Sequence, residues 1–198
     1  MTAAVAALVT ADYRGSRPGI WLAKPLASSV FVAAALAHGA LSSRYGICVL
    51  AALVLSWLGD VLLIPADTRV FRAGIGAFAL AHVAYVAAFA ARAFAPARAA
   101  LAAVPVALAV VLAARWLRPH VPADMVVPVN AYMAIISAMV VAAAGASGAD
   151  PWILAGALLF YASDLTVARE RFVLPSPWNS LVGLPLYYGA QLVLAGTV

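Results

Sequence analysis

Charge is scarce in this sequence. Only 10% of its 198 residues are Asp, Glu, Lys or Arg, whereas 67% are hydrophobic, and the mean hydropathy is +1.04. A soluble domain of this size could not bury so much apolar surface. The composition therefore predicts a protein that crosses a membrane several times. The net charge of +5 does not indicate nucleic-acid binding, because the basic residues are scattered singly between apolar runs.

Cysteine and histidine are also rare. Cys48 is the single cysteine, which excludes an intrachain disulfide and a cysteine-ligated metal cluster. His38 and His120 fall near the ends of apolar segments, which argues against a three-histidine zinc site, although His82 with two aspartates could bind a metal. We expect no metal and no cofactor.

Familiar catalytic loops are missing as well. No serine lies in a G-x-S-x-G motif, and no glycine-rich phosphate loop is present. The first ten residues, MTAAVAALVT, lack the basic start of a secretory signal peptide, so we expect them to belong to a short first helix. The candidates for chemistry are therefore polar residues inside apolar segments.

Long apolar runs make up most of the chain. A spanning helix needs about 20 apolar residues, and cutting the chain at its charges gives eight segments at about 1–13, 22–41, 45–64, 73–93, 97–117, 124–144, 151–168 and 178–197. We predict an all-α fold, a polytopic transmembrane helical bundle of about eight helices in a single transmembrane domain, 1–198. The sequence leaves open whether the short first segment spans the membrane.

Basic residues are unequally distributed between the connections. The odd-numbered connections contain nine, namely Arg14, Arg17, Lys24, Arg69, Arg72, Arg115, Arg118, Arg169 and Arg171, and the even-numbered ones contain three, namely Arg44, Arg92 and Arg98. By the positive-inside rule the odd connections face the cytoplasm and both termini lie on the other side. The expected location is a bacterial inner membrane.

Two aspartates lie inside apolar segments: Asp60 in LVLSWLGDVLLIP and Asp164 in GALLFYASDLTVARERF. Each lies about four residues before the end of a segment that runs toward the cytoplasm, so at roughly 1.5 Å per residue both share a depth about 6 Å inside the boundary. Because a charge in the bilayer is costly, such residues face the bundle interior. The alternative is that they pair with nearby arginines such as Arg69 and Arg169.

Two carboxyls that lie close together in a partly dry site cannot both ionise easily. One therefore keeps its proton and can act as an acid while the other stays anionic, as acid–base hydrolysis requires. Lys24 could hold a phosphate or simply anchor the topology, and a lone buried histidine such as His82 is more often a hydrogen-bonded core residue than a catalyst. The candidates for binding substrate or orienting the carboxyls are Lys24, His82, Tyr85, Asn130, Tyr132, Tyr188 and Gln191.

A weak repeat relates the two halves of the chain. GD at 59–60 is followed on the next segment by His82 and Tyr85, and SD at 163–164 is followed by Tyr187, Tyr188 and Gln191. Because four segments separate the copies, the bundle could be a 4+4 parallel repeat about an axis along the membrane normal.

Several motifs together resemble the YhhN family of membrane proteins: KPL at 24–26, GDVLL at 59–63, GALLFYASD at 156–164 and YYGAQ at 187–191. The family's characterised members are lysoplasmalogenases. The resemblance implies hydrolysis of the vinyl ether bond of a lysophospholipid to a fatty aldehyde and a glycerophospho head group, with the matching Asp60 and Asp164 as catalytic residues. The oligomeric state and the exact head group stay open.

Two other classes of function fit the same sequence. Intramembrane carboxyls and parallel repeats also describe carriers, so a proton-coupled transporter or lipid flippase is the first alternative. A structural membrane protein is the second, although it gives no reason for two buried aspartates.

Overall fold

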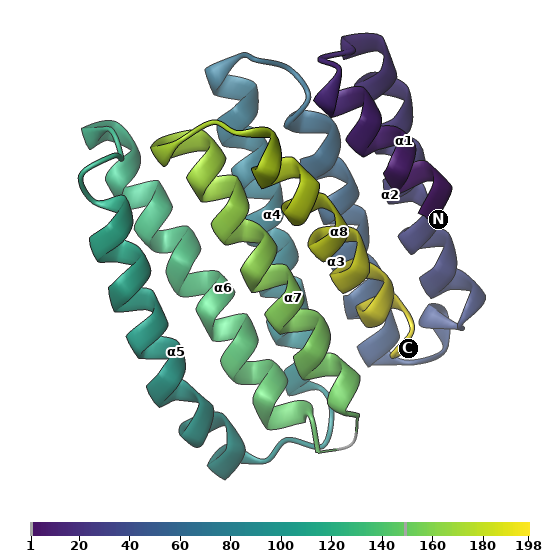
Figure 1. Ribbon diagram of the computed structural model, residues 1–198. Coiled ribbons are helices and arrows are strands. Elements are labelled where there is room, and N and C mark those ends of the chain that lie inside the picture. Colours follow the sequence, from purple (N-terminus) through teal and green to yellow (C-terminus); the bar gives the residue numbers. More distant parts are fainter. Residues whose placement is uncertain (1, 149) are drawn as a thin grey trace.

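The computed structural model describes residues 2–148 and 150–198, and eight α-helices account for most of them (Figure 1). They are α1 (Thr2–Tyr13), α2 (Arg17–Ala37), α3 (Arg44–Leu62), α4 (Thr68–Ala90), α5 (Pro96–Leu117), α6 (Val126–Ala146), α7 (Pro151–Ala168) and α8 (Pro177–Ala195). Short 3-10 turns, η1 (Ala40–Ser42) and η2 (Ala123–Met125), precede α3 and α6, and a π-helix, η3 (Arg169–Val173), extends α7. The predicted all-α fold with about eight helices is confirmed.

Two helices begin several residues before the predicted positions. α2 begins at Arg17 instead of 22, because the Ser16 hydroxyl accepts a hydrogen bond from Gly19 N at 3.3 Å and caps the helix. α4 begins at Thr68 instead of 73, because Asp67 Oδ1 caps its first turn. Charged residues therefore lie inside these first turns, and the charges do not mark the helix ends.

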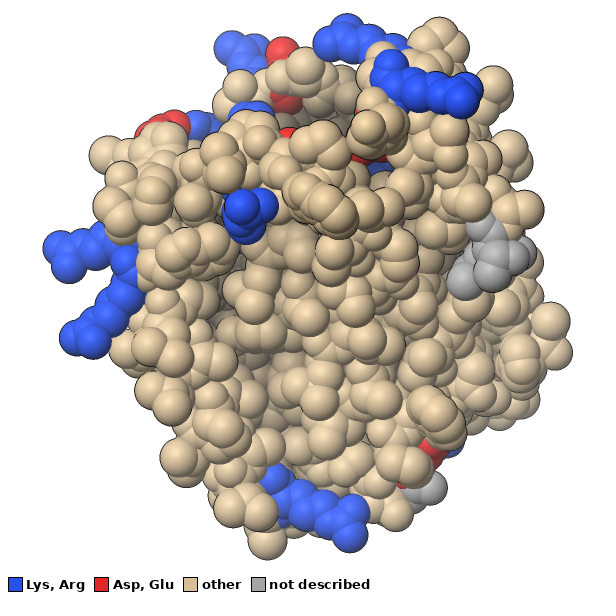
Figure 2. Space-filling model, in the orientation of Figure 1, with Lys and Arg blue, Asp and Glu red and all other residues tan. Residues whose placement is uncertain are grey.

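Six helical stretches are long and apolar enough to cross a membrane, which indicates an integral membrane protein. They are 17–37, 44–62, 68–90, 96–117, 123–146 and 151–173. α1 has 12 residues, so whether it spans stays open. On the face shown in Figure 2, charged side chains lie in the upper part, at the left edge and at the lower end, and a wide area between them has none.

The helices form a closed ring. α2 packs on α3, α3 on α4, α4 on α6, α6 on α7, α7 on α8, and α8 returns to α2. α1 covers the junction between α2 and α8, and α5 packs on the outer side of α6. The connections α1–α2, α3–α4, α5–α6 and α7–α8 lie at one end of the bundle, at the top of Figure 1, which we call the odd-connection end.

The order of packing is similar in the two halves. The pairs α1–α2, α2–α3 and α3–α4 correspond to α5–α6, α6–α7 and α7–α8, and the contact of α4 with α6 corresponds to that of α8 with α2. Two halves related by an axis along the membrane normal would pack in this way. α1 also packs on α8, so the correspondence is approximate, and the 4+4 repeat stays a prediction.

Gly46 lies against the backbone of the turn that precedes α3. A Cβ at this position would lie 2.3 Å from the carbonyl oxygen of Ala40, and backbone cannot move aside as a side-chain end can. We expect Gly46→Ala to lower the free energy of unfolding by about 1–3 kcal/mol, the range for overpacked interiors. Thermal unfolding in detergent measures the loss. Gly76→Ala is the control, because its Cβ would meet no atom within 4 Å; an equal loss in both variants would contradict the prediction.

Candidate functional site

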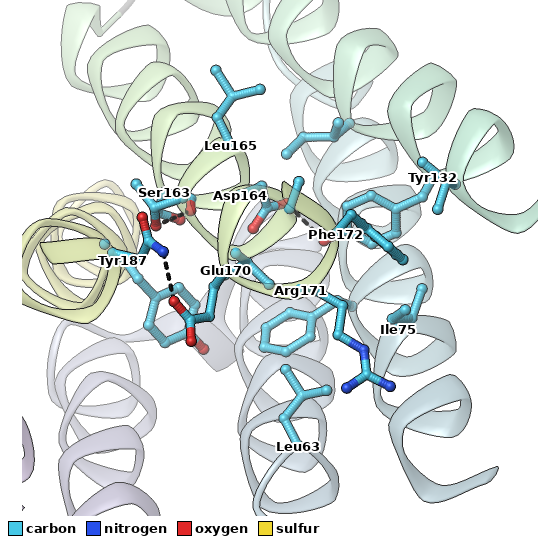
Figure 3. Close-up of a pocket in the computed structure, with 18 of the residues that line it drawn as sticks. Leu63, Ile75, Tyr132, Ser163, Asp164, Leu165, Glu170, Arg171, Phe172 and Tyr187 are labelled. Carbon is cyan, nitrogen blue, oxygen red and sulfur yellow. Dashed lines mark hydrogen bonds between the residues drawn. The ribbon is translucent and has the colours of Figure 1, made fainter. Parts of the chain in front are cut away.

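A cavity of about 520 Å³ lies near the odd-connection end, and Asp164 lines it (Figure 3). Asp60 lines the same cavity. Its volume is typical of small-molecule sites. Most of the other lining side chains are apolar, including Leu63 at the C-cap of α3, Phe78 of α4, Leu117 of α5 and Met133 of α6. The predicted meeting of the two aspartates in one layer of the bundle therefore has a counterpart in the structure.

Asp60 is held by partners from α2 and α8. Its Oδ2 accepts hydrogen bonds from Ser28 Oγ and from Tyr187 OH, each at 2.6 Å. Lys24 Nζ lies 3.4 Å from Oδ1. The residue is 2% exposed, so protein groups replace nearly all of the water around this carboxyl.

Asp164 is held by partners from α4 and α6. Tyr132 OH donates to Oδ2 at 2.7 Å, and His82 Nε2 lies 3.3 Å from the same oxygen and 3.0 Å from Tyr132 OH. The Asp164 side chain is 18% exposed, whereas His82 is fully buried. Both contacts are made to a single oxygen of the carboxyl, and the other oxygen, Oδ1, has no hydrogen-bond partner among the described residues.

In the 4+4 repeat predicted from the sequence, the two aspartates would occupy equivalent positions. Asp60 and Asp164 are 104 residues apart, and so are Ser28 and Tyr132, which each donate to Oδ2 of their aspartate. Tyr187, which donates to Asp60, comes from α8, and His82, which contacts Asp164, comes from α4, the helix that corresponds to α8 in this repeat. Lys24, the third partner of Asp60, comes from α2. The two carboxyls are thus each held by a hydroxyl donor from the preceding helix, but their partners differ chemically, since only Asp60 pairs with a lysine.

Each carboxyl has its own hydrogen-bond network, and aromatic rings lie between the two networks. The Phe160 ring packs on His82 at 4.6 Å and on Tyr187 at 5.4 Å between ring centroids. Within the described chain no hydrogen bond joins the two carboxyls directly. The arginine pairing considered as an alternative is not seen there either, because Arg169 donates to Asn179 Oδ1 at 2.5 Å.

The remaining predicted site residues are only partly brought together. Tyr188 OH lies 3.1 Å from the Oγ of Ser28, the residue that donates to Asp60. Tyr85 OH donates to Gln191 Oε1 at 2.7 Å, and this buried pair does not line the cavity. Asn130 lies on the exposed surface of α6 outside the cavity, so its predicted role in binding substrate gains no support.

Two direct partners of Asp60 were not predicted from the sequence. Ser28 lies one helical turn after Lys24, and its hydroxyl, which donates to Asp60, also lies 2.9 Å from the carbonyl oxygen of Lys24. The shift of 104 residues relates Ser28 to Tyr132 and could have indicated it. Tyr187 stands beside the predicted Tyr188, and residues adjacent on a helix do not share a face.

The π-helix η3 and the segment that follows it form the rim of the cavity. Leu174 N donates to Arg169 O at 2.8 Å, and Glu170 Oε2 accepts from Ser176 N at 2.8 Å and from Asn179 Nδ2 at 2.5 Å. These bonds tie the connection between α7 and α8 to the start of α8. Across residues 2–148 and 150–198, no group of three or more His, Cys, Asp or Glu side chains is arranged to hold a metal ion, and the absence of a metal stays a prediction.

Comparison with known proteins identifies the family of the chain. The sequence model of the YhhN family matches residues 19–198. The chain is 38% identical over 165 residues to a lysoplasmalogenase of Mycobacterium bovis, covering 80% of this chain and 61% of that protein. It is 39% identical over 148 residues to human lysoplasmalogenase TMEM86B, covering 72% of this chain and 59% of the human protein.

The match therefore spans about 60% of the length of these relatives. A pig lysoplasmalogenase TMEM86B is 34% identical over 173 residues, which cover 85% of this chain and 69% of the relative. No solved structure matches the chain. The family match extends over nearly all of the chain and includes both aspartates, and the chain therefore belongs to the YhhN family.

Proposed function

We propose that this chain is a membrane-embedded hydrolase that cleaves the vinyl ether bond of a lysoplasmalogen or a related lysolipid. The observation that carries the proposal is the pair of intramembrane carboxyls, Asp60 and Asp164, in different hydrogen-bond networks on one largely apolar cavity. The names of the relatives support the same reaction. The products would be a fatty aldehyde and a glycerophospho head group.

Asp164 is the proposed acid. Its Oδ2 interacts with both Tyr132 and His82, which leaves Oδ1 to carry a proton toward the cavity. Transfer of this proton to the β-carbon of the vinyl ether uses the electrons of the C=C bond and leaves an oxocarbenium ion. A general acid in this position contributes about 10²–10⁴-fold to a rate.

Asp60 is the proposed anion. Lys24 and two hydroxyl donors surround its carboxyl, and charge-assisted hydrogen bonds of this kind favour a carboxylate. The carboxylate stabilises the oxocarbenium ion and takes a proton from the water that bonds to the cationic carbon. The resulting hemiacetal collapses: its C–O bond to glycerol breaks, the glycerol oxygen gains a proton and the hemiacetal hydroxyl loses one. Glycosidases use a carboxyl pair for a similar cation.

The apolar wall of the cavity is suited to the hydrocarbon chain of the substrate. α5 and α6 contribute Ala113, Leu117, Met133 and Ile136 to this wall. Because α5 packs on α6 at the outer side of the ring, this side of the cavity is the one nearest to surrounding lipid. A chain lying here would place the vinyl ether between the apolar wall and the carboxyls.

The test uses purified protein in detergent micelles with lysoplasmalogen as substrate. We expect release of fatty aldehyde, detected by mass spectrometry, and no release from the saturated ether lysolipid, because that bond offers no C=C to protonate. Micelles also separate the proposal from the carrier alternative, since a carrier requires a sealed vesicle. Absence of aldehyde in micelles together with proton-coupled lipid movement in vesicles would replace the proposal by the carrier.

Tyr132 provides a milder test of the same site. Tyr132→Phe removes the hydroxyl that donates to Asp164 Oδ2. Asp164 becomes a carboxylate as it gives up its proton, and a hydrogen bond to a charged group contributes about 1.5–3 kcal/mol. We expect kcat to fall by about 10- to 100-fold. Tyr45→Phe is the matched control, because its buried hydroxyl bonds Thr197 Oγ1 at 2.6 Å outside the cavity. Equal losses of kcat would assign the effect to stability.

A further inference from the structure

Five charged side chains line the cavity, and most of them have partners of opposite charge or good hydrogen bonds. Lys24 pairs with Asp60, Asp164 accepts from Tyr132, and Glu170 accepts from Ser176 N and Asn179. Arg171 is the exception. Within the described residues it has no carboxylate partner, and its guanidinium lies over the Phe71 ring at 4.1 Å from the centroid.

Arg171 is placed where the charged part of a lipid would lie. It belongs to η3 at the rim, and in Figure 3 its side chain extends from η3 toward the side of the cavity where Leu63 and Ile75 are labelled. Stacking on an aromatic face orients a guanidinium and leaves its N–H groups free to donate. The fork of donors matches the oxygens of a phosphate.

A second cavity of about 280 Å³ adjoins the first. Arg171, Phe71 and Phe172 line both cavities, so they form the wall between them. The second cavity is also lined by polar side chains, among them Thr68, His120 and the ion-paired Arg72 and Asp124. The first cavity is thus mainly apolar and contains Asp60 and Asp164, whereas polar side chains make up a larger share of the lining of the second.

We propose that Arg171 binds the phosphate of the lysolipid at the wall between the two cavities, with the hydrocarbon chain in the first cavity and the polar head group in the second. This inference rests on the proposed function, since it assumes that a phospholipid occupies the first cavity. A three-carbon glycerol spacer separates the vinyl ether from the phosphate, so the two groups belong to adjacent cavities. Lys24 forms an ion pair with Asp60, so it does not serve as the phosphate ligand in this arrangement.

The experiment measures equilibrium binding to the purified full chain in an uncharged, phosphate-free detergent. Three uncleavable ligands differ only at the polar end: 1-O-alkyl lysophosphatidylethanolamine, 1-O-alkylglycerol 3-phosphate and 1-O-alkylglycerol. We expect Arg171→Gln to weaken the two phosphate-containing ligands by about 10- to 100-fold and to leave 1-O-alkylglycerol within about 2-fold. Inorganic phosphate is the fourth ligand, and we expect it to bind far more weakly than the lipid phosphates because it gains nothing from the apolar cavity.

Arg69→Gln is the matched control, because Arg69 is an exposed arginine at the same end of the bundle and lines neither cavity. We expect it to bind all four ligands as the unchanged chain does. Equal weakening of phosphate-containing and phosphate-free ligands by Arg171→Gln, or the same effect from Arg69→Gln, would overturn the inference. Arg171→Lys, which keeps the charge, should retain part of the phosphate preference even if the glutamine variant folds poorly.

Binding and turnover separate the two proposals. If binding depends on the phosphate and on Arg171 but the chain releases no aldehyde, the phosphate site would be supported and the hydrolase proposal would be wrong. Aldehyde release that is unaffected by Arg171→Gln, with no loss of binding, would keep the hydrolase and remove the phosphate site.

Discussion

Asp164→Asn is expected to lower kcat for aldehyde release by about 10³-fold, within the range of a lost general acid. An amide occupies nearly the same space and can still bond Tyr132 and His82, but it cannot deliver a proton to carbon. KM should change little, because the carboxyl lies at the reacting end of the cavity and not along the chain-binding wall. Steady-state kinetics in micelles give both constants.

Asp150→Asn is the matched control for this prediction. Asp150 is the N-cap of the same helix and accepts a hydrogen bond from Trp152 N at 2.9 Å. Asparagine is an equally good N-cap, so this exchange removes a charge from α7 without removing the cap or touching the cavity. Full activity in Asp164→Asn would contradict the assignment of the acid, and equal losses in both variants would show that helix stability, not proton transfer, is affected.

Asp60→Leu is expected to reduce both activity and stability. Lys24, whose side chain is 15% exposed, would lose its anionic partner, and breaking a buried ion pair typically costs about 3–5 kcal/mol. We expect the free energy of unfolding to fall by about 3 kcal/mol, since Lys24 keeps some access to water. Thermal unfolding in detergent measures this loss, and kcat should fall by about 10³-fold at the same time.

The double variant Asp60→Leu with Lys24→Met separates the two roles of Asp60. Replacing a whole buried pair with apolar residues is often neutral or stabilising, so part of the thermal stability should return. The Ser28 and Tyr187 hydroxyls still lack their acceptor, which limits the recovery. Activity should not return, because the carboxylate that stabilises the oxocarbenium ion is still missing. Recovery of kcat in the double variant would mean that Asp60 is only a structural partner of Lys24.

Much of the fold could be predicted from hydrophobicity. Apolar segments of membrane length predict the number and order of the helices, and the equal distance of Asp60 and Asp164 from their segment ends predicts that both carboxyls lie at one depth. The starts of α2 and α4 could not be found in this way, because capping by Ser16 and Asp67 extends each helix past its charged residues.

The parts of the site that sequence reasoning missed depend on helix orientation. Asn130 and Tyr132 are two residues apart, and residues at this spacing point to different faces of a helix. Tyr132 therefore reaches Asp164 whereas Asn130 is exposed. In the sequence, Arg171 contributes only to the prediction of which connections face the cytoplasm. Its position at the cavity depends on the π-helix at the end of α7, and no hydrophobic pattern indicates a π-helix.

Because of this π-helix, the site depends more on the number of residues in segment 169–173 than on which residues they are. A π-turn contains an extra residue relative to an α-turn, as the bond from Leu174 N to Arg169 O shows. Removing one residue from 169–173 would restore an ordinary turn and rotate everything after it by roughly 100° about the helix axis. The Arg171 guanidinium would then point away from the wall between the two cavities. The register of the contacts between α7 and α8 would also shift. Single-residue deletions should be selected against in this segment even where substitutions, for example at Val173, leave the bundle unchanged.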